Sequence, residues 1–174
     1  MSPLDAVKAA ALLLLVAPFQ VSVLSSLEVA EGHPDALLVL LVAVALLRGP
    51  IFGSLAGFWA GLAIDVATLA EPLGLSSLLL TLVGYWTGRL GEVTSRSSAH
   101  VPLLAVALAT LGYGLGSLIV RFMLGTAIPA SQFFVAVLLP TFALNILLAY
   151  PLYLLVRRLL RPPVHGGREV SALV

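Results

Sequence analysis

The chain has 174 residues, of which 60% are hydrophobic and only 10% are charged, and its mean hydropathy is +1.12. Soluble domains carry about a quarter charged residues, so this composition excludes an ordinary soluble domain and predicts a protein that crosses the bilayer several times. The net charge of +1 argues against nucleic-acid binding as a main task, and the absence of cysteine excludes thiol catalysis, disulfides and cysteine-ligated metals.

Six apolar segments follow one another along the chain and predict an all-α, polytopic membrane helix bundle with six transmembrane segments. They lie at about 6–27, 36–47, 51–69, 72–88, 101–124 and 130–156. The first begins like a signal peptide, but its apolar run is long enough to span, so we expect an uncleaved helix. We expect residues 1–161 to form a single transmembrane bundle and residues 162–174 to form a flexible cytoplasmic tail.

The second segment is short. Its apolar run from Ala36 to Leu47 rises only about 18 Å, less than the hydrocarbon core of about 30 Å. Two interpretations are open: the segment spans a thinned bilayer while Arg48 reaches toward the interface, or it forms a re-entrant half-helix. The following Gly49 and Pro50 predict a tight break, because proline disfavours a helical conformation in the residue before it.

The basic residues are distributed unequally between the two sides of the membrane in the predicted topology. If all six segments span and the N-terminus is cytoplasmic, every one of the nine basic residues except Arg121 falls on the cytoplasmic side. This is the positive-inside pattern of plasma-membrane proteins, and it favours six spans with both termini in the cytoplasm. A re-entrant second segment would instead place the N-terminus outside.

Small residues recur at helical spacing. The third segment carries Gly53, Gly57 and Gly61 at every fourth position, and the fourth carries Gly84 and Gly88. Residues four apart lie on nearly one helix face, and glycines there let another backbone approach closely. Two interpretations are open: the stripe packs inside its own bundle, or it docks the helix of a partner protein.

One acid, Asp65, follows the stripe within a span, where a carboxylate is costly and needs a partner. The topology places it in the outer leaflet, at a depth similar to that of Arg121. Either the two residues interact, or Arg121 extends outward while Asp65 caps a helix or meets water. We also expect the mid-segment Trp59 to pack in the bundle, and Asn145 in the last segment to hydrogen-bond across helices.

Enzyme chemistry has little support in the sequence. His33, His100 and His165 all fall outside the spans, and a single intramembrane acid cannot make an aspartyl dyad. The chain has no H-E-x-x-H, G-x-S-x-G or phosphate-binding G-x-x-x-x-G-K motif. The sequence therefore predicts a protein that is not an enzyme and needs no cofactor or metal.

These motifs together resemble the bacterial rod shape-determining protein MreD family. The likeness rests on the turn residues Arg48, Gly49 and Pro50, on the stripe from Gly53 to Asp65, on the turn containing Pro72 and Gly74, and on Gly84-Tyr85. It implies a non-enzymatic inner-membrane scaffold of the cell-elongation machinery, which supports lateral peptidoglycan synthesis and rod shape. The implied partners are an MreC-type single-span protein and, through it, MreB, RodA and a transpeptidase.

That family is in turn similar to the substrate-binding membrane subunits of energy-coupling-factor vitamin transporters. This second likeness implies their fold and an alternative function, a small-ligand-binding subunit of a vitamin-type transporter. The sequence shows no dedicated set of ligand-binding residues, so the scaffold is the favoured interpretation.

Overall fold

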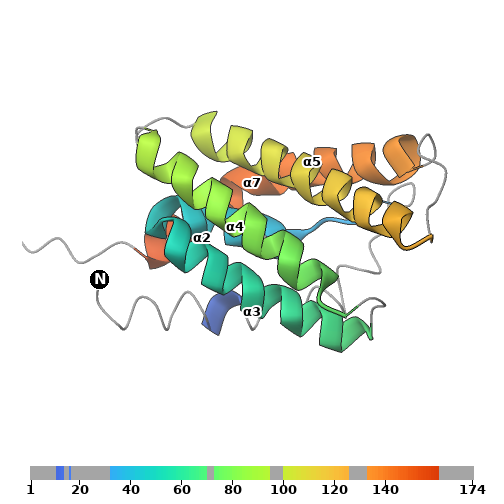
Figure 1. Ribbon diagram of the computed structural model, residues 1–174. Coiled ribbons are helices and arrows are strands. Elements are labelled where there is room, and N and C mark those ends of the chain that lie inside the picture. The colour runs from blue at the N-terminus through green and yellow to red at the C-terminus, as the bar shows by residue number, and fades with distance from the viewer. Residues whose placement is uncertain are drawn as a thin grey trace, which may run out of the picture.

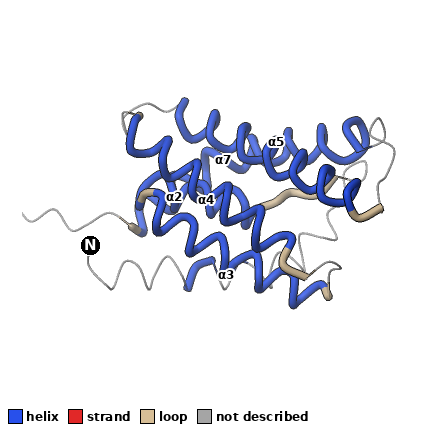
Figure 2. Tube along the Cα trace, viewed as in Figure 1, coloured by secondary structure: helices blue, strands red, loops and turns tan. Residues whose placement is uncertain are grey.

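The computed structural model describes residues 11–13, 16, 32–69, 73–94, 100–125 and 133–160, and its elements there are all helices (Figures 1 and 2). In chain order they are α2 Ala36–Arg48, α3 Pro50–Thr68, α4 Leu75–Val93, α5 His100–Met123, the π-helix η2 Phe133–Leu138, and α7 Leu139–Leu159. The all-α prediction is confirmed for this part of the chain. Most of the predicted first helix, and all of the predicted tail, lie outside the described residues.

Three described stretches are long and apolar enough to cross a membrane: α3, α5, and the run Phe133–Leu159 that joins η2 to α7. Helix α4 is as long as α3, at 19 residues, but carries Arg89 and Glu92 near its end. Helix α2 has only 13 residues, which is about 20 Å at 1.5 Å per residue. The count of six spans therefore stays a prediction.

The short helix α2 lies at the centre of the bundle. Helices α3, α4 and α5 form one layer, α2 and α7 lie behind it (Figure 1), and α2 contacts all four of the others. Every residue from Leu37 to Leu46 is at most 4% exposed. Because protein surrounds α2 on all sides, its length does not have to match the thickness of the hydrocarbon core.

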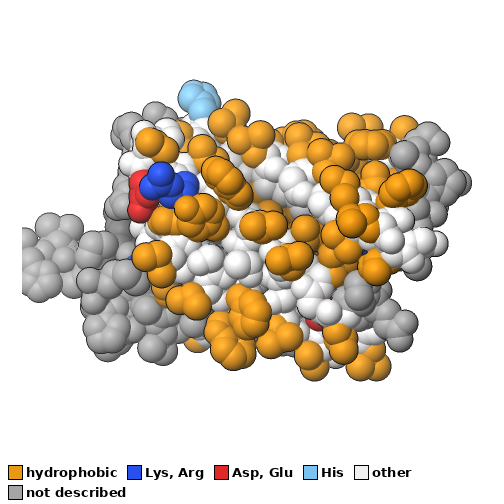
Figure 3. Space-filling model, in the orientation of Figure 1, with side chains coloured by type: hydrophobic (Ala, Val, Ile, Leu, Met, Phe, Trp, Pro, Cys, Tyr) orange, Lys and Arg blue, Asp and Glu red, His pale blue; other side chains and the backbone are white. Residues whose placement is uncertain are grey.

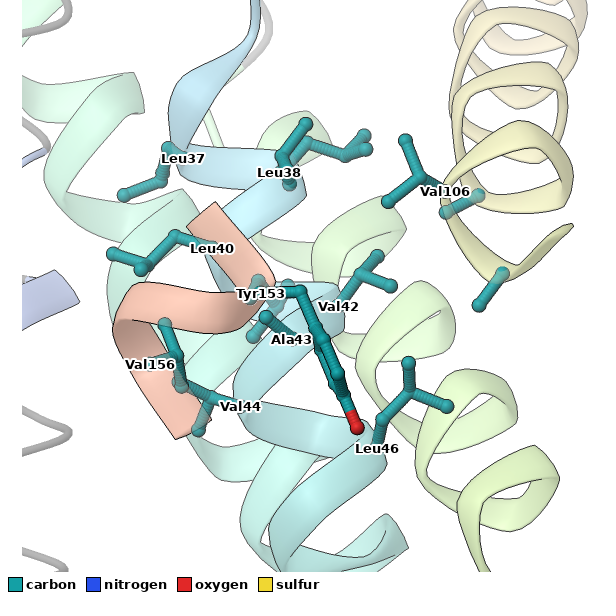
Figure 4. Close-up of a cluster of buried hydrophobic side chains, with 14 of the residues drawn as sticks. Leu37, Leu38, Leu40, Val42, Ala43, Val44, Leu46, Val106, Tyr153 and Val156 are labelled. Atoms are coloured by element: carbon teal, nitrogen blue, oxygen red, sulfur yellow. The ribbon is translucent and has the colours of Figure 1, made fainter. Parts of the chain in front are cut away.

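Figure 4 shows how this centre is filled. The aliphatic side chains of α2 meet Val106 of α5 and Tyr153 and Val156 of α7, all of which are at most 8% exposed. Burial on this scale stabilises the contacts between helices through close packing, the main source of helix association within a bilayer.

The outside of the bundle is apolar as well. Figure 3 shows hydrophobic side chains spread over α3, α4 and α5, as a surface in contact with lipid requires. The prediction that Trp59 packs in the bundle is wrong, because its side chain is 59% exposed. It lies two residues after Gly57, about 200° around the helix, and the glycine face is the one turned inward.

The described charges gather at the two ends of the bundle. Helices α2, α4 and α7 end where α3 and α5 begin (Figure 1), and this end holds Arg48, Arg89, Arg157 and Arg158. Arg121 lies near the opposite end, as do Asp35 and Asp65. The separation of basic residues expected from the charge pattern is therefore present in the described part of the chain.

Candidate functional site

The glycine stripe of α3 lies against α4, backbone to backbone. A Cβ atom added to Gly53 would meet the carbonyl of Gly84, one on Gly57 would meet the carbonyl of Leu80, and one on Gly61 would meet the backbone of Ser77. Each of these obstacles is main chain, which cannot rotate out of the way. The structure therefore brings the stripe and Gly84 together in one internal interface.

The contact continues to the arginine-rich end of the bundle. A Cβ on Gly88 would meet Gly49, which lies between α2 and α3, and Pro50, which begins α3. Gly49 has φ +90°, and Pro50 is the first residue of α3, where its fixed φ and missing N–H are tolerated. The predicted break after Arg48 is confirmed, and the Arg48 side chain donates to the carbonyl of Leu160 at 3.5 Å.

The Asp65 carboxylate holds the opposite end of the α3–α4 pair. One oxygen accepts from the backbone N–H groups of Gly74 at 2.9 Å and Ser77 at 3.2 Å, and the other accepts from Ser76 at 3.3 Å. Asp65 is 0% exposed. The first N–H groups of a helix have no partner within the helix and carry partial positive charge, so Asp65 both neutralises and caps the start of α4.

Two backbone features let the chain turn from α3 back into this cap. Gly74, the N-cap residue of α4, has φ +95°, a conformation that favours glycine. Leu69, which follows α3, has φ +49°. Pro72 of the predicted motif lies outside the described residues.

The partners of Asp65 differ from one of the two expected arrangements. All three of its donors are backbone N–H groups, and none comes from Arg121. Arg121 lies exposed near the end of α5. The contacts match the capping interpretation, and the physical reason is proximity: Gly74 follows Asp65 by only 9 residues, and the start of α4 lies directly against the carboxylate.

A second buried polar group joins α2, α5 and α7. The side-chain oxygen of Asn145 accepts from the backbone N–H of Asp35 at 2.8 Å, and its amide nitrogen donates to Thr110 Oγ1 at 3.1 Å. Asn145 is 0% exposed. The prediction that it bonds across helices is confirmed.

The same region supports the non-helical backbone that precedes α2. His33 N–H donates to Thr141 Oγ1 at 3.3 Å, and the Asp35 side chain caps α2 by accepting from Leu38 N–H at 2.9 Å. Backbone polar groups outside a helix or sheet need partners from elsewhere in the protein. Residues 33–35 meet this condition through side chains of α7.

A cavity of about 210 Å³ lies beside this network. Residues 33–38, α5, η2 and α7 form its walls, and Asn145, Thr110, Tyr113 and Phe133 are among the lining side chains. Sequence reasoning missed it, because the walls come from segments far apart in the chain. Among the described residues, no group of three or more His, Cys, Asp or Glu side chains could hold a metal ion.

Comparison with known proteins gives one match. Residues 6–162 match the family model described as rod shape-determining protein MreD. Comparison with curated proteins and with solved structures finds no match, so the resemblance to transporter subunits stays a prediction.

Proposed function

The chain belongs to the MreD family of rod shape-determining proteins, and from this we propose that it is a non-enzymatic scaffold of the cell-elongation machinery in the bacterial plasma membrane. In this role it binds an MreC-type single-span protein and, through it, MreB, RodA and a transpeptidase, and supports lateral peptidoglycan synthesis. The observation that carries the proposal is the family match, which covers residues 6–162 of the 174 and includes the whole glycine-and-turn motif.

The packing of the bundle narrows where a partner can bind. Helix α4 already occupies the glycine stripe of α3, so a partner's transmembrane helix has to contact an outward face. Those faces carry large apolar side chains, among them Leu55, Trp59, Leu82 and Trp86, all at least 49% exposed. The basic end of the bundle is suited to anionic head groups or an acidic cytoplasmic surface.

Co-purification tests the proposed function. The full chain, tagged and expressed in a rod-shaped host at native level, is expected to retain a single-span elongation protein through mild detergent extraction. A stable complex with a pair of ATPases, or a retained vitamin-like ligand, would overturn the scaffold in favour of a transporter subunit. A chain that is isolated alone from cells containing the elongation proteins would contradict it as well.

We further propose that the arginine-rich end faces the cytoplasm, as the positive-inside pattern indicates. The chain has no cysteine, so single-cysteine variants are unambiguous reporters. Val93, at the arginine-rich end, and Leu69, at the other end, are 83% and 82% exposed. A membrane-impermeant maleimide should label L69C in intact spheroplasts but V93C only after permeabilisation; the reverse pattern would show that the orientation is inverted.

A further inference from the structure

The cavity of about 210 Å³ has mainly apolar walls. The apolar lining residues include Leu38 of α2 and Phe133, Val137 and Leu138 of η2, and the polar ones include His33 and Asp35. An engineered apolar cavity of about 150 Å³ in a soluble protein stays dry and takes up small apolar guests. The present cavity differs in being partly open, but its mainly apolar walls favour hydrocarbon over water in the same way.

Several polar groups in the cavity wall already have hydrogen-bond partners. Asn145 bonds both Asp35 and Thr110, and Thr141 accepts from His33. The Ser117 hydroxyl donates to the carbonyl of Gly114 in its own helix at 2.8 Å. Among the described residues, every buried side-chain nitrogen and oxygen has a hydrogen-bond partner. A polar ligand would have to break these bonds, whereas an alkyl chain would not.

The cavity lies where hydrocarbon is available. Helix α5 and the run Phe133–Leu159 both qualify as membrane spans, and both contribute residues to the walls of the cavity, which is partly open. Nearby outward positions are strongly apolar and exposed, with Val135 at 70% and Ile119 at 58%. Lipid acyl chains are therefore the molecules expected at its opening.

The helix that forms one wall is locally widened. Phe133–Leu138 is a π-helix that runs directly into α7. Pro140, near the start of α7, has no N–H with which to bond the preceding turn. Single-turn π segments often mark functional sites, and this one supplies Phe133, Val137 and Leu138 to the cavity.

We propose that this cavity binds the end of a lipid acyl chain, inserted between α5 and η2. The bound chain fills space that the bundle's own side chains leave empty, and it fixes one lipid at this position on the bundle. This site is independent of the proposed partner binding, which uses outward faces rather than an internal space.

Lipid retention tests the proposal. The full chain is placed in nanodiscs of phosphatidylglycerol with defined acyl chains, and the lipid that stays bound on release from the nanodisc is measured by native mass spectrometry. Ser117→Phe fills the cavity with a ring and removes only a bond within α5. The retained lipid should fall about tenfold, equivalent to about 1.4 kcal/mol of binding free energy. The wild-type chain should keep one lipid.

The control is Leu115→Phe, on the same helix but 40% exposed and directed away from the cavity; it should retain lipid as the wild type does. If S117F fails to fold, as judged by its thermal midpoint, Val137→Phe fills the cavity from the opposite wall. Retention that is unchanged in the folded variant, or a wild-type chain that retains no lipid, would overturn the proposal.

Discussion

Replacing Asp65 with alanine is expected to destabilise the bundle by about 3 kcal/mol or more, because three backbone N–H groups at the start of α4, including that of the N-cap Gly74, lose their common acceptor. The carboxylate is 0% exposed, and its bonds to Gly74, Ser76 and Ser77 are 2.9–3.3 Å long. Each unsatisfied buried donor costs about 1–3 kcal/mol, and the favourable charge at the helix start is lost as well. Denaturant titration of the purified chain in micelles measures this loss.

One further substitution separates the charge of Asp65 from its role as an acceptor, and a second, at Glu92, serves as a control. Asp65→Asn keeps an acceptor oxygen but loses the charge and turns an NH₂ group toward N–H donors, so it should fall between wild type and D65A. Glu92→Ala removes an exposed acid from α4. Glu92 forms a 3.1 Å salt bridge with Arg89, and the two side chains are 48% and 59% exposed. Such an exposed pair contributes at most about 1 kcal/mol. If D65A unfolds no more readily than E92A, the cap does not hold the α3–α4 pair.

A charge exchange addresses the alternative pairing. If Asp65 acts as a cap, Asp65→Arg combined with Arg121→Asp should recover none of the stability lost in D65R, because an arginine cannot accept from backbone N–H groups. Recovery in the double variant would show that the two residues do interact.

Periodicity and turn chemistry carried much of the fold prediction. The expected segment 51–69 is α3, Pro50–Thr68, and the expected 101–124 is α5, His100–Met123. Both agree because long apolar runs fix helix length. The break at Gly49 and Pro50 followed from their backbone restrictions alone. These features depend on local sequence, and the sequence alone therefore predicts them.

Features that depend on tertiary contacts were less accessible. The start of α4 was predicted at residue 72, whereas the helix begins at Leu75. Its start depends on the cap that Asp65 supplies from α3, and this is a tertiary contact. Whether Asp65 pairs with Arg121 or caps a helix depends on where the start of α4 lies relative to the carboxylate, which the sequence alone does not give. The central position of α2 could not be predicted either, because the sequence pattern of a short apolar run does not distinguish a helix surrounded by protein from one surrounded by lipid.

The second large effect concerns the stripe itself. Gly57→Ala should destabilise the bundle by about 1–3 kcal/mol, and Gly57→Leu by more, because added side-chain atoms have to push α4 away. The first obstacles are the carbonyl of Leu80 and the backbone nitrogen of Thr81. Alanine is also a better helix former than glycine by up to about 1 kcal/mol, so a net loss identifies the steric cost.

Gly112 provides the matched control. It also lies within a helix, α5, but a Cβ added there meets nothing within 4 Å. Gly112→Ala should therefore leave stability unchanged or raise it by up to about 1 kcal/mol. The pair of variants compares the same chemical change with and without a facing backbone.

The central claim is that the glycine stripe joins α3 to α4 inside this chain and leaves only outward faces for partners. The thermal unfolding midpoint of the isolated chain, purified without any partner, tests it most directly. We predict a lower midpoint for G57A than for wild type, and an unchanged or higher midpoint for G112A. A G57A chain that unfolds like the wild type when alone, yet no longer binds its partner in the membrane, would contradict the account and assign the stripe to the partner instead.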